Sequence, residues 1–338
     1  MEFKDFFEQV KATERDTEFT PCTVEDIRVK VDETPNEYAE TDSPIAVTVN
    51  GEDVYARGIA WPSLLARAKI SGTSLSKLNP EDLSMVVNTC MKVNKDIGLA
   101  VMVGNKLSAV LSDGYRILSV TEIYRMANEE FSKYGEFMDG FVDDTGFGAR
   151  WKLKGEIGNA YGDNLTPVIE LYTSNTGHSA VNLVPKLVRG GRFEFICGSS
   201  MSVEHKGKSS LQDVQDLVSM AYAIARKAVK QMDALKNISV RHPVETFLNT
   251  AKKIGVPKKL AMMALTDFTD MIYGNEDDVC AYDVYMGLVE TVFYAQQAGK
   301  DKRFCDNLQE IVARALTISW TESDNNKIEW VVKSLPAA

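Results

Sequence analysis

The spacing of apolar residues changes along this chain, and the change limits the folds that it can adopt. Between residues 97 and 197, apolar and polar residues alternate in short runs separated by Gly, Asn and Asp, which is typical of strands. An amphipathic helix interrupts these runs at residues 120–135, with its final glycine as the expected C-cap. Beyond that region, Ser210 and Asp213 form a capping-box start, and the apolar positions then follow helical spacing. We therefore predict an α+β fold: a β-rich N-terminal and middle domain with embedded helices, followed by an all-helical C-terminal region.

The part of the chain before residue 97 combines a hairpin with two helices. Residues 1–60 are acidic and contain one hairpin signal, Asn50-Gly51 between two short apolar runs. Helices are expected at residues 61–70 and 79–93, the second with Asn79 as its N-cap. The predicted domains are an N-terminal acidic segment with a short hairpin (1–60), an α+β core domain (61–209), a helical C-terminal region (210–320) and a tail (321–338).

The composition is that of a soluble globular protein, with 44% hydrophobic and 25% charged residues. No apolar run reaches the roughly 18 residues of a membrane-spanning helix, and the charged N-terminus has no apolar secretory segment. Five cysteines are scattered without C-x-x-C spacing, which favours free thiols in a reducing compartment. We therefore expect a cytoplasmic protein that has no membrane partner.

The chain carries no recognisable catalytic motif, so we expect neither enzyme activity nor a cofactor. No phosphate-binding glycine loop and no nucleophile elbow is present, and no two of the histidines have metal-ligand spacing. The histidines are His178, His205 and His242. Two acidic pairs, Asp143-Asp144 and Asp277-Asp278, leave a metal-dependent enzyme as a third hypothesis. Acidic pairs in loops are more often solvated or cap helices.

One segment of this acidic chain is locally basic. The net charge of −10 disfavours a protein that coats nucleic acid through its overall charge. Residues 150–208, however, hold eight Lys or Arg against five Asp or Glu, which gives a local charge of +3. Basic side chains neutralise phosphates, and exposed aromatic rings stack on bases. The candidate nucleic-acid contacts are Lys106, Tyr115, Arg116, Lys186, Arg189, Arg192, Lys206 and Lys208.

Tyr115 and Arg116 belong to the stretch LSAVLSDGYRIL, which we interpret as a strand, a turn at Asp113-Gly114 and a second short strand. Neighbouring strand residues point to opposite faces, so an outward Arg116 could join Lys106 as a basic pair across the hairpin. Tyr115 is then a possible stacking residue. The alternative is an ordinary surface arginine beside a core tyrosine. The same choice, between base stacking and a strand core, applies to the two phenylalanines of RFEFIC.

Five stretches stand in a defined order between roughly residues 60 and 315. They are LSAVLSDGYRIL, ELYTSNTGHSAVNLVPKLVR, FICGSSM, HKG and CAYDVYMGLVETVFYAQQ. Their order resembles that of a phage/plasmid-like family of unknown function. One departure is Gly198-Ser199 after Cys197, where the family usually has Asn-Gly, so no role of that asparagine is carried over. The resemblance implies a mobile-element context and a fold similar to that of phage single-strand annealing proteins.

Our leading hypothesis is a phage- or plasmid-encoded, cytoplasmic, non-enzymatic protein of nucleic-acid metabolism. It would bind single-stranded DNA through a local basic groove, in annealing or recombination, and act as a homo-oligomer. The alternative is a protein-interaction factor of a phage or mobile element, whose acidic surface and helical half dock a host protein. The net charge of −10 and the lack of catalytic motifs fit both hypotheses equally.

Overall fold

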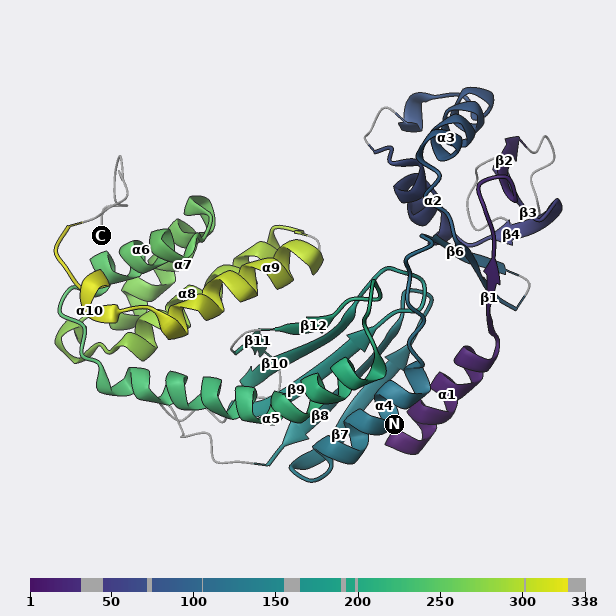
Figure 1. The fold of residues 1–338 in the computed structure, drawn as a ribbon. Helices are drawn as coiled ribbons and strands as arrows, with labels where there is room; N and C mark the ends of the chain where they lie inside the picture. Colours follow the sequence, from purple (N-terminus) through teal and green to yellow (C-terminus); the bar gives the residue numbers. More distant parts are fainter. Residues whose placement is uncertain are drawn as a thin grey trace.

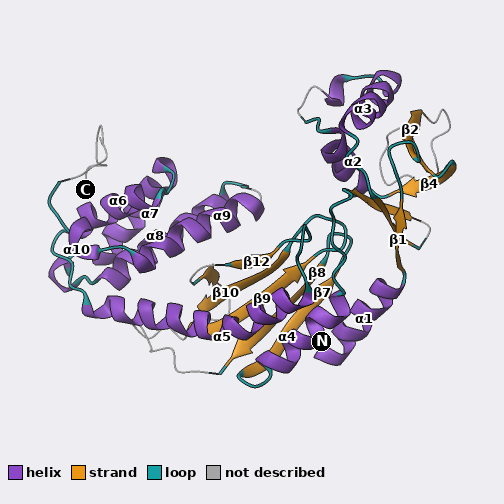
Figure 2. Ribbon diagram, in the orientation of Figure 1, coloured by secondary structure: helices purple, strands orange, loops and turns teal. Residues whose placement is uncertain are grey.

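The chain folds into two sheets and a bundle of helices, seen here in a computed structural model (Figures 1 and 2). The structure describes residues 1–31, 45–71, 75–104, 106–154, 165–189, 193–197, 200–300 and 302–327. Both sheets lie in the N-terminal and middle region, and the described residues after the second sheet are built from helices and short connections. The predicted α+β class is therefore confirmed.

The N-terminal sheet is built from strands on both sides of residue 60. The strands are β1 (Thr17–Pro21), β2 (Ile27–Val31), β3 (Ile45–Val49), β4 (Glu52–Ala56), β5 (Leu99–Val103) and β6 (Lys106–Leu111), in the order β1-β5-β6-β4-β3-β2. Helices α2 (Ala60–Ala68) and α3 (Pro80–Asn94) contribute buried residues to the core of this sheet, among them Leu64 and Val87. Because β1 pairs with β5 and β4 pairs in parallel with β6, the strands before residue 60 form one sheet with strands that follow it.

Local sequence signals determine two features of this part. Asn50 and Gly51 connect β3 to β4 with φ values of 54° and 84°, the two positive φ angles that a type I′ turn requires. The side chain of Asn79 accepts a hydrogen bond of 2.8 Å from the backbone N–H of Asp82, which caps α3. The predicted hairpin and the predicted cap are both confirmed.

The second sheet forms the middle of the molecule, and helices cover one of its faces. Its strands are β7 (Gly135–Val142), β8 (Phe147–Leu153), β9 (Leu165–Thr173), β10 (Val181–Arg189), β11 (Phe193–Ile196) and β12 (Met201–Val203). The order is β11-β10-β9-β8-β7, and β12 pairs with β10. Helices α1 (Phe3–Arg15), α4 (Val120–Phe131) and α5 (Leu211–Ala234) pack against the buried side chains of Trp151, Ile169 and Leu183. Strand alternation places charged residues on the opposite face.

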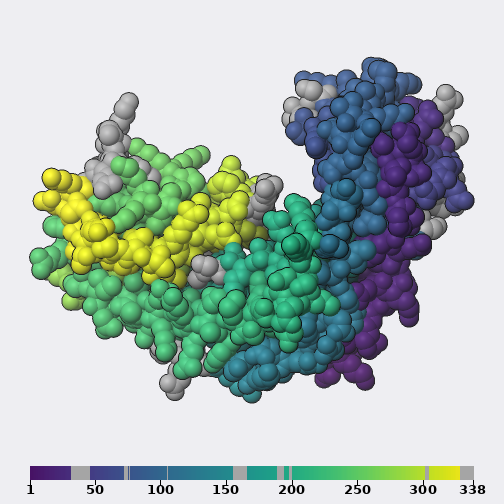
Figure 3. Space-filling view, viewed as in Figure 1, coloured from purple at the N-terminus to yellow at the C-terminus, as the bar shows by residue number. Residues whose placement is uncertain are grey.

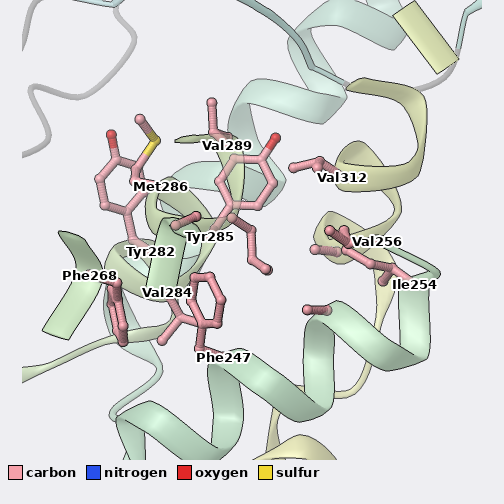
Figure 4. Packing of buried hydrophobic residues seen from close by; sticks show 14 of the residues in the cluster. Phe247, Ile254, Val256, Phe268, Tyr282, Val284, Tyr285, Met286, Val289 and Val312 are labelled. Carbon is pink, nitrogen blue, oxygen red and sulfur yellow. The ribbon is translucent and has the colours of Figure 1, made fainter. Parts of the chain in front are cut away.

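The helical region follows α5, and its helices pack around α8. Its helices are α6 (Pro243–Ile254), α7 (Lys258–Ile272), α8 (Ala281–Gln297), α9 (Lys302–Ala313) and α10 (Trp320–Ser323). Figure 4 shows Phe247, Phe268 and Tyr285 in the core of this region, where the rings of Phe247 and Phe268 stack with centroids 5.2 Å apart. Phe195 of β11 is buried in the same core, as expected for a core strand face rather than a base-stacking residue.

Two local predictions are wrong. The C-cap of α4 is Ser132, and Gly135 instead begins β7, where it pairs with Leu153. The stretch after the Asp113-Gly114 turn forms no second strand beside β6; Tyr115 makes only an isolated bridge with Lys206. In both cases contacts with distant parts of the chain determine the conformation, and local periodicity carries no information about them.

Gly135 is required by the close approach of β7 to β8. A Cβ atom at this position would lie 2.2 Å from the backbone oxygen of Lys152. We predict that Gly135→Ala lowers the free energy of unfolding by about 1–3 kcal/mol, because backbone atoms must move to make room. Urea denaturation followed by circular dichroism measures this change. Gly114→Ala is the matched control, since a Cβ there meets no atom within 4 Å; equal effects of the two substitutions would contradict the explanation.

Candidate nucleic-acid interface at the junction of the two sheets

Two segments from distant parts of the sequence meet where the N-terminal sheet joins the second sheet. Residues 112–119 follow β6, and residues 204–208 follow β12. Tyr115 and Lys206 form an antiparallel bridge, and the backbone N–H of Arg116 donates to the carbonyl oxygen of His205 at 2.9 Å. The contact places three exposed basic residues near one another, which we call the junction patch: Arg116, Lys206 and Lys208.

The guanidinium of Arg116 is held in place by the backbone. Its Nε donates to the carbonyl oxygen of Gly207 at 2.6 Å, and in the described part of the chain its terminal nitrogens form no ion pair. Lys206 lies 3.7 Å from the carboxylate of Glu204, but both side chains are about 70% exposed, so water screens this pair strongly. The two segments together carry the three cations of the junction patch against Asp113 and Glu204, a net charge of +1, with one oriented arginine.

Tyr115 packs inside the junction rather than on its surface. Its ring stacks on the ring of His205, with centroids 5.2 Å apart and planes within 3°. Its hydroxyl donates to the carbonyl oxygen of Ser174 at 3.2 Å, and burial raises the pKa of Tyr115. Because His205 occupies one face of the ring, these contacts agree with the alternative that places a core tyrosine beside a surface arginine.

His205 is the buried partner that connects both segments to β9. Only 5% of the residue is exposed. Its Nδ1 donates to the carbonyl oxygen of Arg116 at 3.1 Å, since a carbonyl can only accept. In the neutral ring, Nε2 then accepts from the hydroxyl of Thr173 at 3.2 Å. Burial lowers the pKa of His205, and the hydrogen bond to Arg116 opposes this shift to a smaller extent.

Lys186 belongs to a separate group of charges on the uncovered face of the second sheet. Its ammonium lies 2.6 Å from a carboxylate oxygen of Glu170 and 3.8 Å from one of Glu194, and only 13% of the side chain is exposed. Arg150 on β8 pairs with Asp139 and Glu194. Because carboxylates compensate both cations, this face does not have the charge of a phosphate-binding surface.

A cleft of about 930 Å³ lies between this charged face and the ends of α8 and α9. Its lining includes five carboxylates and three cations, so the cleft is net acidic. The carboxylates are Asp139, Asp143, Glu170, Glu194 and Asp306, and the cations are Arg150, Lys186 and Lys300. This cleft therefore repels a phosphate backbone, and the candidate positive surface lies at the junction instead.

The remaining predicted contacts do not join the junction patch. Lys106 begins β6, at the other end of the strand from the junction, and its ammonium lies 4.8 Å from the centroid of the Tyr55 ring. Arg189 is the last residue of β10, at the opposite end of the strand from Val181. Eight residues of a strand span about 27 Å. Arg192 lies outside the described residues. The seven candidates that the structure describes are thus distributed over at least three places.

The acidic pairs considered as metal ligands make contacts within the protein. The carboxylate of Asp143 accepts from the backbone N–H groups of Thr145 and Gly146 at 2.8 and 3.0 Å, and Asp144 pairs with Arg57 at 2.6 Å. Asp277 and Asp278 lie in a short 3₁₀ turn before α8. Within the described ranges, no group of three His, Cys, Asp or Glu side chains is placed to hold a metal ion. All five cysteines are free thiols.

Sequence reasoning missed one lysine near the junction. Lys95 is an exposed residue that follows α3, with a φ value of 48°. Its segment reaches the junction because Gly98 lies directly against Asp113, where an added Cβ would be 2.3 Å from the Asp113 Cα. Lysine is common after the C-terminus of a helix, where it interacts favourably with the helix dipole, so no sequence signal distinguishes Lys95.

No protein-family model, no curated protein and no solved structure matches this chain. The resemblance to a phage/plasmid-like family therefore stays a prediction made from the sequence. In the part of the chain that the structure covers, none of the helices combines the length and apolar character needed to cross a membrane.

The buried His205 predicts a stability that depends on pH. Its pKa in the folded protein lies below the ordinary value of 6.5, so the unfolded chain binds more protons between these two values. The free energy of unfolding should therefore fall as the pH drops below 6.5, by at most about 1.4 kcal/mol per pH unit for one group. Urea denaturation between pH 5 and 8 measures the slope (a range of roughly 3 units around the histidine pKa). His205→Gln should remove it, whereas the exposed His178 should leave it unchanged when replaced by Gln.

The ion pairs of Lys186 predict a structural rather than a ligand-binding role. We expect Lys186→Gln to lower the free energy of unfolding by about 1–3 kcal/mol, because Glu170 and Glu194 lose their partner in a partly buried site. Adding Glu170→Gln should recover part of this loss. Denaturation curves of the single and double variants test the coupling. Additive losses would show that the pair contributes nothing.

Proposed function

We propose that the protein binds single-stranded nucleic acid at the junction of its two sheets. The observation that carries the proposal is the junction patch, in which Arg116, Lys206 and Lys208 are exposed, basic and brought together from two distant segments. Arg116 donates through Nε to the protein, which leaves its terminal nitrogens for a phosphate oxygen. The patch thus has the donors and the sign of charge that a phosphate backbone requires.

The position of the patch supports a single strand over a duplex. Figure 3 shows a hollow that opens between the N-terminal part and the helical C-terminal part, with the middle of the chain as its floor, and the N-terminal part meets the middle at one corner of this floor. Duplex DNA is stiff over about 150 base pairs, so it does not follow a corner between two parts of one small protein. A single strand bends freely and can follow such a corner. Lys95 would extend its path from the junction toward the N-terminal sheet.

The contacts that we propose are all made to phosphates, so we expect the binding to be independent of base sequence. Tyr115 plays no stacking role in it, because its ring packs on His205. Sequence-independent binding of single strands suits a factor that anneals or recombines the DNA of a phage or plasmid, the context implied by the family resemblance. The patch is local, which reconciles nucleic-acid binding with a net charge of −10.

The triple variant Arg116→Ala, Lys206→Ala, Lys208→Ala tests the proposal. Fluorescence anisotropy of a labelled oligothymidine measures affinity across a series of salt concentrations. Each single-strand phosphate contact contributes about 0.7 to the slope of log affinity against log salt, so losing three contacts should reduce the slope by about 2. Affinity at low salt should fall by roughly tenfold or more. Wild-type protein that fails to bind at low salt would contradict the proposal.

A matched control distinguishes the loss of the junction patch from a general loss of positive charge. Arg226, Lys227 and Lys230 are exposed on α5 and make up the same set of one arginine and two lysines. Replacing all three by Ala changes the net charge equally and should leave the salt slope close to that of the wild type. Equal losses in the two triple variants would mean that overall charge, and not the junction, governs binding.

A further inference from the structure

The helical region contains a long acidic stretch, away from the junction patch. Residues 260–299 contain seven acidic side chains and neither lysine nor arginine. The acidic residues are Asp267, Asp270, Glu276, Asp277, Asp278, Asp283 and Glu290. These residues cover most of α7, the turn that follows it and α8, and only Lys258 and Lys259 at the start of α7 oppose their charge within the helix pair.

A groove of about 720 Å³ runs along this helix pair, and its floor is apolar. The floor includes Phe268 and Ile272 of α7 and Met286 and Gly287 of α8. Gly287 permits the close contact of the two helices, because an added Cβ would lie 2.8 Å from the Phe268 ring. The groove is thus built into the packing of the helices.

Carboxylates and exposed apolar side chains surround this floor. Asp267, Asp278 and Glu290 belong to the lining of the groove, which contains no lysine or arginine among the residues that the structure describes. Met271 also lines the groove and is 56% exposed, and the nearby Tyr273 is 82% exposed. Methionine adapts its shape to different apolar partners, so this surface combines an adaptable apolar floor with an acidic border.

We propose that the α7–α8 groove binds a basic amphipathic helix of a partner protein. A helix lays its apolar stripe along a groove between two helices, with anchors at positions i, i+3, i+4 and i+7. Lysine or arginine on either side of that stripe would meet the carboxylates at the border, which gives charge complementarity. Nucleic acid is excluded from this surface because its phosphates would face the same carboxylates.

The groove and the junction patch are independent surfaces of opposite charge. The patch is formed by segments after β6 and β12, whereas the groove lies on two helices of the C-terminal core. The partner-binding proposal therefore does not depend on nucleic-acid binding, and the triple variant of the patch should bind the helix as well as the wild type does. Failure of one proposal leaves the other intact.

The test uses a labelled synthetic peptide of about 18 residues, long enough to form several helical turns. It carries leucine at helical anchor spacing and lysine at most other positions. One control peptide keeps the leucines and replaces every lysine by glutamate. A second control has the same composition with the leucine spacing broken. Fluorescence anisotropy with the full-length protein should show saturable binding of the first peptide, with at least about tenfold weaker binding of both controls.

Two variants of the protein locate the binding site. Met271→Glu should weaken binding by about tenfold, because it removes an exposed apolar contact beside the floor, and Asp278→Lys should weaken it several-fold by charge repulsion. Met85→Glu on α3 and Glu52→Lys on β4 are the matched controls, since both residues are exposed and lie in the N-terminal sheet domain. Circular dichroism verifies that each variant is folded.

Three results would overturn the proposal. The first is an absence of binding by the basic amphipathic peptide. The second is equal binding of the peptide with broken leucine spacing, since the surface would then attract any polycation, including a polyamine. The third is unchanged affinity in Met271→Glu together with a loss in Met85→Glu, which would place the peptide elsewhere.

Discussion

A single continuous helix, α5, determines how the sheets and the helical region are joined. Its first turns bury Val214 and Ala221 in the core of the second sheet, whereas Ala228 and Met232 belong to the core around α8. The helix has 24 residues and begins at a capping box formed by Ser210 and Asp213, so it is about 36 Å long and acts as one rigid element. Because it takes part in both cores, neither core can shift along the helix without losing buried apolar area, and the surfaces on either side keep a fixed separation.

The molecule separates its charges along this frame. Basic side chains gather where backbone segments join the two sheets, and acidic side chains gather on α7 and α8. On the uncovered face of the second sheet, Lys186 and Arg150 are paired to carboxylates, and the cleft above this face is net acidic. The net charge of −10 is the sum over the whole chain, so it does not give the local charge of any of these surfaces. Two ligands of opposite charge could therefore occupy the protein at the same time without competing for the same surface.

The sequence predicts those features that depend on neighbours along the chain. The α+β class follows from apolar spacing, the β3–β4 hairpin from Asn50-Gly51, and the start of α3 from Asn79. Features that depend on register or on distant contacts could not be predicted. The pairing of Lys186 with Glu170 requires the register of β9 and β10, and the stack of Tyr115 on His205 requires two loops to meet. Arg116, Lys206 and Lys208 were predicted as candidates from residue type, but their proximity, and the separation of Arg189 from them, come from the tertiary structure.

The hydrogen bond from Arg116 to Gly207 joins positions that are 91 residues apart, and the chain between them contains α4 and the whole second sheet. Closing a loop of this length costs chain entropy, which the contacts at the junction must offset. The junction patch therefore exists only where the two segments are folded against each other. A ligand that contacts both segments would bind this folded state and would favour it by mass action. Recognition at the junction is in this way coupled to the completion of folding, so that an incompletely folded chain lacks the surface altogether.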